Sequence, residues 1–126
     1  MSLPLSPVLA KSFQDLRFRG WNFSPSYWVQ AGSRSEGRLI ELAVLLPHEK
    51  IEAIGFKAFG DAYTIGILSW VCSQVFGQTW DSLSKLSLPA MVGELQIPSH
   101  KVSAAVLIEE CIQKLMEKKT CVKTKN

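Results

Sequence analysis

The sequence predicts an α+β domain in which helices pack on one face of a small, three-stranded antiparallel sheet. Apolar and polar residues alternate in two neighbouring runs, residues 39–46 and 51–59, and a proline-containing turn at residues 47–50 can join them as a hairpin. Segments with helical periodicity precede and follow this pair. With 126 residues, 47% hydrophobic and 20% charged, the chain is expected to form one domain, residues 1–126, around one core.

The N-terminal part is expected to supply a short helix and an edge strand. The helix starts at Ser6-Pro7 and ends before Gly20. Residues 17–23 interleave arginines with aromatic residues, a pattern that can stack on nucleic-acid bases but that we interpret as aromatic cover for a sheet edge. Residues 26–31 form the edge strand. The apolar face of the helix is expected to consist of Val8, Leu9, Phe13 and Leu16.

The paired runs are expected to form the centre of the fold. Alternation places the apolar residues of 40–46 on one face, and those of 54–58 on the corresponding face of the second strand. Gly60 and Asp61 then interrupt the strand pattern. Asp61 is well placed to cap a helix that begins near Ala62.

Helices account for the rest of the chain. Cys72 and Cys111 fall on apolar helical stripes, so we expect both to lie in the core, and Glu110 and Lys114 are spaced for an ion pair on the outside. Gly77 suits the end of a helix. The expected helices are residues 62–76, 80–86 capped by Thr79, 90–95 opened by Pro89, and 101–117 after an extended break at residues 97–100.

Charge and cysteine content exclude several classes of protein. The net charge is only +3 and is concentrated in lysines after residue 113, so residues 119–126 are expected to be a basic, frayed tail and no nucleic-acid surface is indicated. No apolar run is long enough to span a membrane, and no secretory signal is recognisable. Three cysteines without a C-x-x-C pair argue against disulfides and favour a cytoplasmic protein.

No sequence motif of a common enzyme class is present. The chain lacks the phosphate-binding, dinucleotide-binding, zinc-protease and serine-hydrolase patterns. Its two histidines, His48 in the hairpin turn and His100 beside Pro98, have no neighbouring Cys or Asp that would suggest a triad or a metal site. We therefore expect no enzymatic activity.

Residues 32–118 nevertheless resemble the IscU/NifU N-terminal family of iron–sulfur cluster assembly scaffolds. The hairpin ending in Phe59-Gly60 stands where that family has a hairpin ending in Tyr-Gly-Cys. Residues 77–83, Gly-Gln-Thr-Trp-Asp-Ser-Leu, stand for its Gly-Lys-Ser-Leu-Asp-Glu-Ala. Residues 97–101, Ile-Pro-Ser-His-Lys, stand for Leu-Pro-Pro-Val-Lys, and residues 108–112 for the Leu-Ala-Glu-Asp-Ala-Ile segment.

The ligand motifs of the family are where this chain departs from it. The resemblance implies a site built from three cysteines with Asp and His, supplied by Ala-Cys-Gly-Asp, Tyr-Gly-Cys and Lys-x-His-Cys. Iron–sulfur clusters require thiolate ligands, with imidazole as the usual substitute, so we expect no cofactor and no persulfide acceptor here. The substituted positions are Glu36 for Cys, Arg38 for Asp, Asp61 for Cys, Ser103 for His and Ala104 for Cys.

The substitutions suggest an ion pair where the family holds a metal. If the loops meet as in the family, Arg38 is expected to reach Asp61 or Glu36 and neutralise the pocket. The alternative is a hard-cation site formed by Glu36 and Asp61. It is less favoured because two carboxylates next to an arginine make a poor cation cage.

The resemblance leads to three functional hypotheses. The first is a cluster-free scaffold paralogue that acts in or around iron–sulfur assembly by binding a cysteine desulfurase, a chaperone or a true scaffold. Residues Ile97, Pro98, Ser99, His100 and Lys101 are its expected partner-binding loop, since the family presents that loop to a chaperone. The second is a metal or cluster carrier that uses Glu36 and Asp61, or ligands supplied by a partner. The third is an adaptor unrelated to iron–sulfur chemistry.

Overall fold

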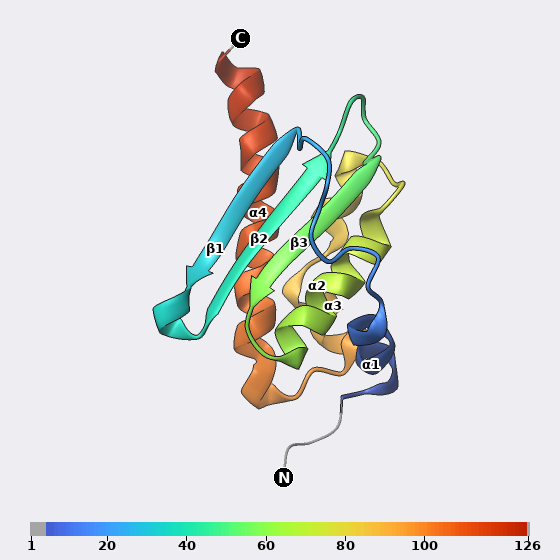
Figure 1. Ribbon diagram of the computed structural model, residues 1–126, viewed down its shortest axis with the longest axis vertical. Coiled ribbons are helices and arrows are strands. Elements are labelled where there is room, and N and C mark those ends of the chain that lie inside the picture. The colour runs from blue at the N-terminus through green and yellow to red at the C-terminus, as the bar shows by residue number, and fades with distance from the viewer. Residues whose placement is uncertain (1–4, 126) are drawn as a thin grey trace.

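A three-stranded antiparallel sheet in the order β1-β2-β3 forms one layer, and helices form the other. The computed structural model describes residues 5–125, and side chains for residues 5–119. Figure 1 shows the helices α2, α3 and α4 behind the sheet, so the expected α+β architecture is confirmed. The elements are α1 Pro7–Gln14, β1 Tyr27–Ser33, η1 Arg34–Glu36, β2 Arg38–Leu45, β3 Ala53–Phe59, α2 Ala62–Val75, η2 Trp80–Lys85, α3 Leu88–Leu95, η3 Ser99–Lys101 and α4 Val102–Lys125, where η marks short 3-10 turns.

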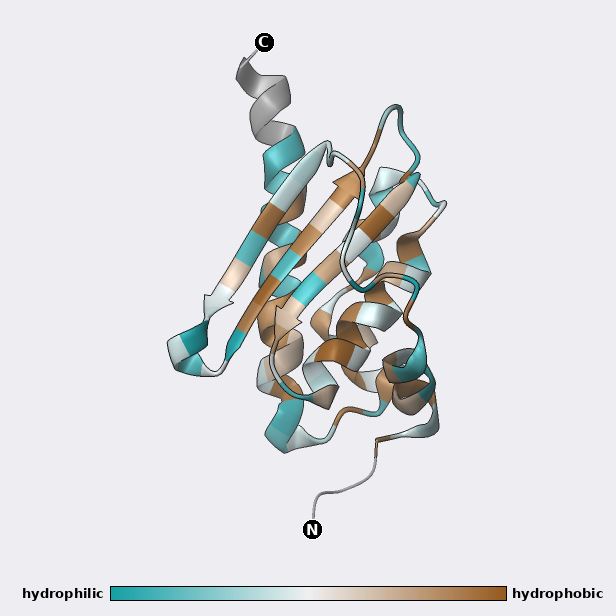
Figure 2. Ribbon diagram, in the orientation of Figure 1, coloured by the Kyte–Doolittle hydropathy of each residue, from teal (hydrophilic) through white to brown (hydrophobic). Residues whose placement is uncertain are grey.

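The core lies between the inner face of the sheet and the helices. Strand alternation places Ile40, Leu42 and Val44 of β2 inside, beside Ile54 and Phe56 of β3, as predicted from the sequence. The brown segments of β2 and α2 in Figure 2 show how the apolar residues concentrate on this central pair. The inner face of α4 is also buried and carries Cys111, as expected, together with Ala104, Ala105, Ile108, Ile112 and Leu115.

The edge of β3 is covered by the aromatic segment that follows α1. The Phe56 N–H donates to the Phe18 carbonyl at 2.8 Å, and the Gly20 N–H donates to the Phe56 carbonyl at 2.6 Å. Phe18 is 4% exposed. The interpretation of residues 17–23 as cover for a sheet edge is therefore confirmed, and the backbone itself makes the cover.

The expected apolar face of α1 is wrong in part. The helix begins as predicted, with the Ser6 hydroxyl accepting from the Leu9 N–H at 3.2 Å, but it ends at Gln14. Leu16 therefore lies outside the helix and is 66% exposed. Of the four residues expected on this face, only Leu9 is fully buried.

The connection between β2 and β3 is longer than the turn predicted from the sequence. β3 begins at Ala53 because the backbone of Ile51 pairs elsewhere. The Ile51 N–H donates to the Gln78 carbonyl at 2.9 Å, and its own carbonyl accepts from Gly77 at 2.9 Å. The hairpin loop is therefore held by the segment after α2.

Three further helical expectations need correction. The short helix expected at residues 80–86 is a 3-10 helix of residues 80–85, and the Thr79 side chain makes no capping hydrogen bond there. The break before α4 contains the short turn η3. α4 continues to Lys125 and not to Glu117. Of the basic tail expected from residue 119 onward, Lys119 is the one residue whose side chain is described. No helix in the described part of the chain is both long and apolar enough to cross a membrane.

Candidate functional site

Three segments that are distant in sequence meet at the end of the sheet where β2 begins and β3 ends. They are the start of β2, the turn between β3 and α2, and the η3–α4 junction. Their polar side chains form one hydrogen-bonded group, which we call the Asp61 cluster and which consists of Arg38, Asp61, Thr64, Lys101 and Ser103.

One oxygen of Asp61 caps α2. Gly60 ends the strand, and Asp61 adopts an extended backbone conformation, with φ −86° and ψ 179°, that turns its side chain onto the first helical turn. Its Oδ1 accepts from the Thr64 N–H at 3.0 Å and from the Thr64 hydroxyl at 2.9 Å. The N-cap predicted from the sequence is confirmed, and it fixes the carboxylate in place.

The other oxygen of Asp61 faces two cations. Lys101 Nζ lies 2.5 Å from Oδ2, and Arg38 Nη2 lies 3.8 Å from the same atom. Arg38 also donates through Nε to the Thr64 hydroxyl at 3.2 Å and through Nη1 to the Ser103 hydroxyl at 3.0 Å. The expected pairing of Arg38 with Asp61 is present, but Lys101 is the closer partner.

The electrostatic balance of the cluster keeps Asp61 ionised. Burial favours the neutral acid and acts to raise the pKa of Asp61. Hydrogen bonds from Lys101 and Thr64 outweigh this effect and lower the pKa to about 2. With two cations around one carboxylate, the cluster carries an excess of positive charge, which disfavours a bound metal cation.

Glu36 and Ala104, the other two positions singled out in the sequence, lie apart from this network. Glu36 is in η1, where its carboxylate accepts from the Ser33 hydroxyl at 2.8 Å. Ala104 is fully buried in the core. Within the described residues, no group of three or more His, Cys, Asp and Glu side chains is arranged to hold a metal ion. The two carboxylates proposed for a hard cation thus have different partners.

The loop expected to bind a partner is divided between core and surface. Ile97 is 6% exposed and belongs to the core, while Lys101 is engaged with Asp61. Pro98 precedes the turn η3, which presents Ser99 and His100 to solvent. Only the middle of this loop is therefore available at the surface.

The two cysteines with described side chains are both in the core, as predicted. Cys72 on α2 and Cys111 on α4 are fully buried and unpaired. Burial raises the pKa of both thiols, that of Cys111 to about 12. Neither thiol is placed to serve as a thiolate ligand at the Asp61 cluster. Cys121 lies outside the described side chains.

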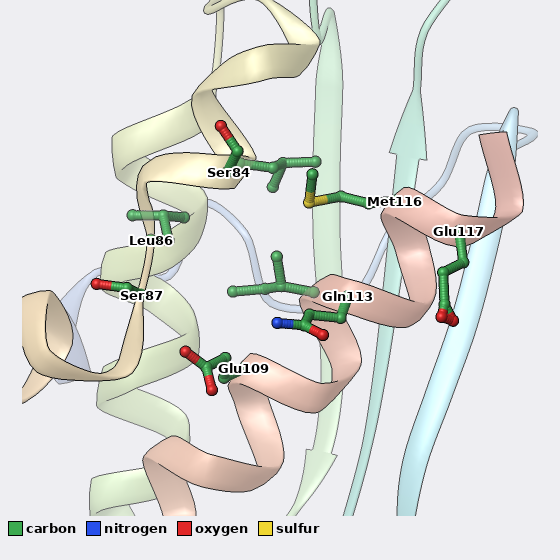
Figure 3. Close-up of a pocket in the computed structure, with 9 residues that line it drawn as sticks. Ser84, Leu86, Ser87, Glu109, Gln113, Met116 and Glu117 are labelled. Atoms are coloured by element: carbon green, nitrogen blue, oxygen red, sulfur yellow. The ribbon is translucent and has the colours of Figure 1, made fainter. Parts of the chain in front are cut away.

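A separate groove runs between α4 and the segment joining η2 to α3. Figure 3 shows Ser84 and Ser87 on one wall and Glu109 and Gln113 of α4 on the other. Glu109 is committed to the fold, since its carboxylate accepts from the Leu88 N–H at 2.6 Å and so ties α4 to the start of α3. The groove has a volume of about 340 Å³ and contains no residue of the Asp61 cluster.

Sequence reasoning missed three members of the cluster as functional partners. From the sequence, Lys101 belongs to the expected partner loop, Thr64 carries no signal, and Ser103 is marked only as a substituted position. The signal that links two of them is the family register, which places Lys101 and Ser103 within the Lys-x-His-Cys motif, residues 101–104 here. Their contacts depend on how the η3–α4 junction packs.

Comparison with protein families decides the relationship of this chain. The profile of the NifU-like N-terminal domain matches residues 8–123. The chain belongs to the NifU-like N-terminal domain family. This family includes iron–sulfur cluster assembly scaffolds. Comparison with curated protein sequences gives no match.

Solved structures share the fold of this NifU-like domain at low sequence identity. A protein from Fervidobacterium islandicum AW-1, assigned as an iron–sulfur cluster assembly scaffold for the SUF system, gives a TM-score of 0.73 at 14% identity, covering 87% of this chain and 94% of that one. The N-terminal part of a nitrogen-fixing NifU-like protein from Brucella abortus gives a TM-score of 0.64 at 14% sequence identity, covering 90% of this chain and 94% of that one. A hypothetical protein gives a TM-score of 0.62 at 18% sequence identity, covering 84% of this chain and 94% of that one.

Proposed function

We propose that this NifU-like domain is a cluster-free member of its family, which acts in or around iron–sulfur cluster assembly through protein–protein binding. The observation that carries the proposal is the Asp61 cluster. Arg38, Asp61 and Ser103 stand at positions that the resemblance assigns to metal ligands. Arg38 contacts both Ser103 and Asp61, and Asp61 also pairs with Lys101.

The donor set does not fit a cluster or a closed zinc site. An iron–sulfur cluster needs thiolates, and structural zinc takes four nitrogen or sulfur donors. The five substituted positions offer two carboxylates, a guanidinium, a hydroxyl and a methyl group. The described thiols are buried elsewhere. The same absence of a thiolate removes the position at which a persulfide would be received.

Partners are proposed from the family relationship and from what the surface leaves available. A cysteine desulfurase, a chaperone or a cluster-bearing scaffold would recognise surfaces that the fold retains. The exposed Ser99 and His100 provide one such surface. We expect the protein to act in the cytoplasm, where such assembly proteins and reduced cysteines are found together.

Reconstitution tests the cluster-free proposal. The purified protein, incubated anaerobically with ferrous iron, sulfide and a thiol reductant, is expected to remain colourless and to retain neither iron nor sulfide. A variant with Glu36→Cys, Asp61→Cys and Ala104→Cys places thiols at the three family positions and tests whether their loss is what prevents metal binding. A charge-transfer band with stoichiometric iron and sulfide in the wild-type protein would refute the proposal.

A binding experiment separates the proposed role from that of an unrelated adaptor. A cysteine desulfurase and a scaffold encoded in the same genome are purified and titrated against the protein by calorimetry. Binding to either supports a role in assembly, and His100→Ala tests whether the η3 turn contributes. Absence of binding to both favours an adaptor that reuses the fold.

A further inference from the structure

The groove between α1 and α2 is lined by the apolar side chains of Val8 and Trp70 together with polar and charged ones. It has a volume of about 530 Å³. Figure 1 shows α1 beside α2, and α1 also contacts α3. We define the α1–α2 groove by Val8, Lys11, Asp15 and Arg17 on one side and Trp70 and Gln74 of α2 on the other.

Large apolar side chains are exposed at this groove and in the segments that adjoin it in sequence. Val8 lines it and is 43% exposed, and Leu16, between two lining residues, is 66% exposed. Phe76 is 46% exposed and packs on Phe18, with ring centroids 5.7 Å apart. These are three of the six large hydrophobic residues exposed in the described part of the chain. Apolar exposure that gathers at one groove is typical of a protein-binding surface.

The charges around the groove are unbalanced. Arg17 pairs with Asp15 at 2.8 Å, and Arg19 stacks on Phe13 at 5.0 Å. Lys11 is exposed and forms no ion pair with any described residue. Among the residues that line the groove, Lys11 and Arg17 are the cations and Asp15 is the acid, and the exposed Arg19 follows just outside it. A partner with acidic residues would be attracted to these cations and oriented by them.

We infer that the α1–α2 groove binds an acidic amphipathic helix of a partner protein. A third helix laid between two packed helices buries apolar residues at every third or fourth position. Glutamates or aspartates flanking those positions would meet Lys11 and Arg17. The groove shares no residue with the Asp61 cluster. The inference therefore does not depend on whether the domain binds an iron–sulfur cluster.

A second copy of this chain is a less suitable occupant. Its α4 offers Glu109, Glu110 and Glu117 along one face. However, Glu109 is bonded to the Leu88 N–H, and Glu110 lies 3.7 Å from Lys114. An α4-to-groove contact would also be head-to-tail and would form open chains, a type of assembly that soluble proteins generally avoid. A different protein with a free acidic helix fits better.

The test uses two synthetic helical peptides of about 18 residues, both with leucines at helical spacing on one face. One carries glutamates beside the leucines, and its control carries lysines at the same positions. Binding is followed by backbone amide shifts of the isotope-labelled full chain. The acidic peptide is expected to shift amides of α1 and the Trp70 region, and to bind more weakly as salt rises from about 50 to about 500 mM.

Variants locate the binding surface. Lys11→Glu and Leu16→Ser are each expected to weaken the acidic peptide by about fivefold or more. Lys85→Glu, an exposed lysine of η2 outside the groove, is expected to change its affinity less than twofold. Asp61→Ala is expected to leave binding unchanged, which separates this result from the cluster-free proposal. Circular dichroism confirms that each variant is folded.

Three results would overturn the inference. Equal binding of the basic peptide would show that charge does not select the partner. Shifts confined to another surface, or none at millimolar peptide, would show that the groove is not a helix site. If the apparent molecular mass of the unliganded protein rises with its concentration, and Lys11→Glu abolishes this rise, the occupant is a second copy of the chain.

Discussion

At the scale of single residues, Asp61 has two structural roles at once. One oxygen caps α2 through Thr64, and the other faces Lys101 and Arg38. Its side chain is 35% exposed, so solvent screens the ion pairs and each contributes little by itself. Their combined effect is positional, because the carboxylate joins the start of β2, the start of α2 and the η3–α4 junction.

Double-mutant cycles should rank the two cations. Because Lys101 lies 2.5 Å from Asp61 and Arg38 lies 3.8 Å away, the coupling of Asp61 with Lys101 is expected to be the larger. We expect about 0.5–1 kcal/mol for the Asp61→Asn and Lys101→Met pair, and less for Asp61→Asn with Arg38→Met. Urea unfolding at neutral pH measures both cycles. Equal couplings would contradict the geometric ranking.

The ion pairs of Asp61 should weaken in acid. Its pKa in the folded protein is about 2, below the value of about 4 for an unfolded chain. Stability from this group is therefore fully present above pH ~4 and lost as the pH falls through ~2. Asp61→Asn keeps an N-cap side chain, so the difference in unfolding free energy between wild type and variant should narrow over this range. A constant difference would show that the charge of Asp61 does not stabilise the fold.

At the scale of elements, β3 depends on close backbone approach by the segment after α1. A Cβ atom built on Gly55 would lie 2.3 Å from the Gly20 carbonyl oxygen and 3.0 Å from Trp21. Lys57 Nζ then lies 4.2 Å from the centre of the Trp21 ring. The absence of a side chain at Gly55 is what allows this segment to cross β3 and protect its edge from pairing with another chain.

Gly55→Ala is expected to destabilise the protein by about 1–3 kcal/mol, because backbone atoms must move to admit the methyl group. Hydrogen exchange at the Phe56 amide, which bonds to Phe18, should accelerate more than exchange in the rest of the sheet.

Gly93→Ala is the matched control. Gly93 lies in α3, and an added Cβ would meet no atom within 4 Å. Helix propensity predicts a gain of up to about 1 kcal/mol there. A loss at Gly93 as large as that at Gly55 would show that steric contact is not the cause.

At the scale of the whole molecule, α2 is the most enclosed helix of those with fully described side chains. It lies between the sheet, α1 and α4, and its buried residues occupy most of its circumference, including the polar Thr64 and Ser69. Thr64 bonds to Asp61, and the Ser69 hydroxyl donates to the Asp15 carbonyl at 3.2 Å. Opening this layer therefore requires most of the fold to open.

The buried thiols should report on that opening. Cys72 and Cys111 have raised pKa values and no exposure, so they should react with a thiol reagent only after global unfolding. In a Cys121→Ser background, labelling of the native protein is expected to be at least about a thousandfold slower than in denaturing urea. Mass spectrometry of peptides assigns each site. Rapid native labelling of Cys72 would remove it from the core.

Local pattern was sufficient to predict the sheet and the main helices. The alternation of residues 40–46 determined which face of β2 is buried, and the aspartate at position 61 determined where α2 begins. The stripe from Ala104 to Leu115 determined the inner face of α4. These features depend on the periods of strands and helices and on a cap that acts within one turn, so neighbouring residues encode them.

The candidate site was decided by tertiary structure. Sequence placed Arg38 and Asp61 in one pocket through family resemblance, but it did not identify Lys101, 40 positions further along, as the closer partner of Asp61. Ile51 left the predicted strand because its backbone bonds to residues after α2. Leu16 is exposed because α1 ends at Gln14, two residues before Leu16. In each case the deciding partner is remote in the chain, or the helix end depends on packing, and no local period carries that information.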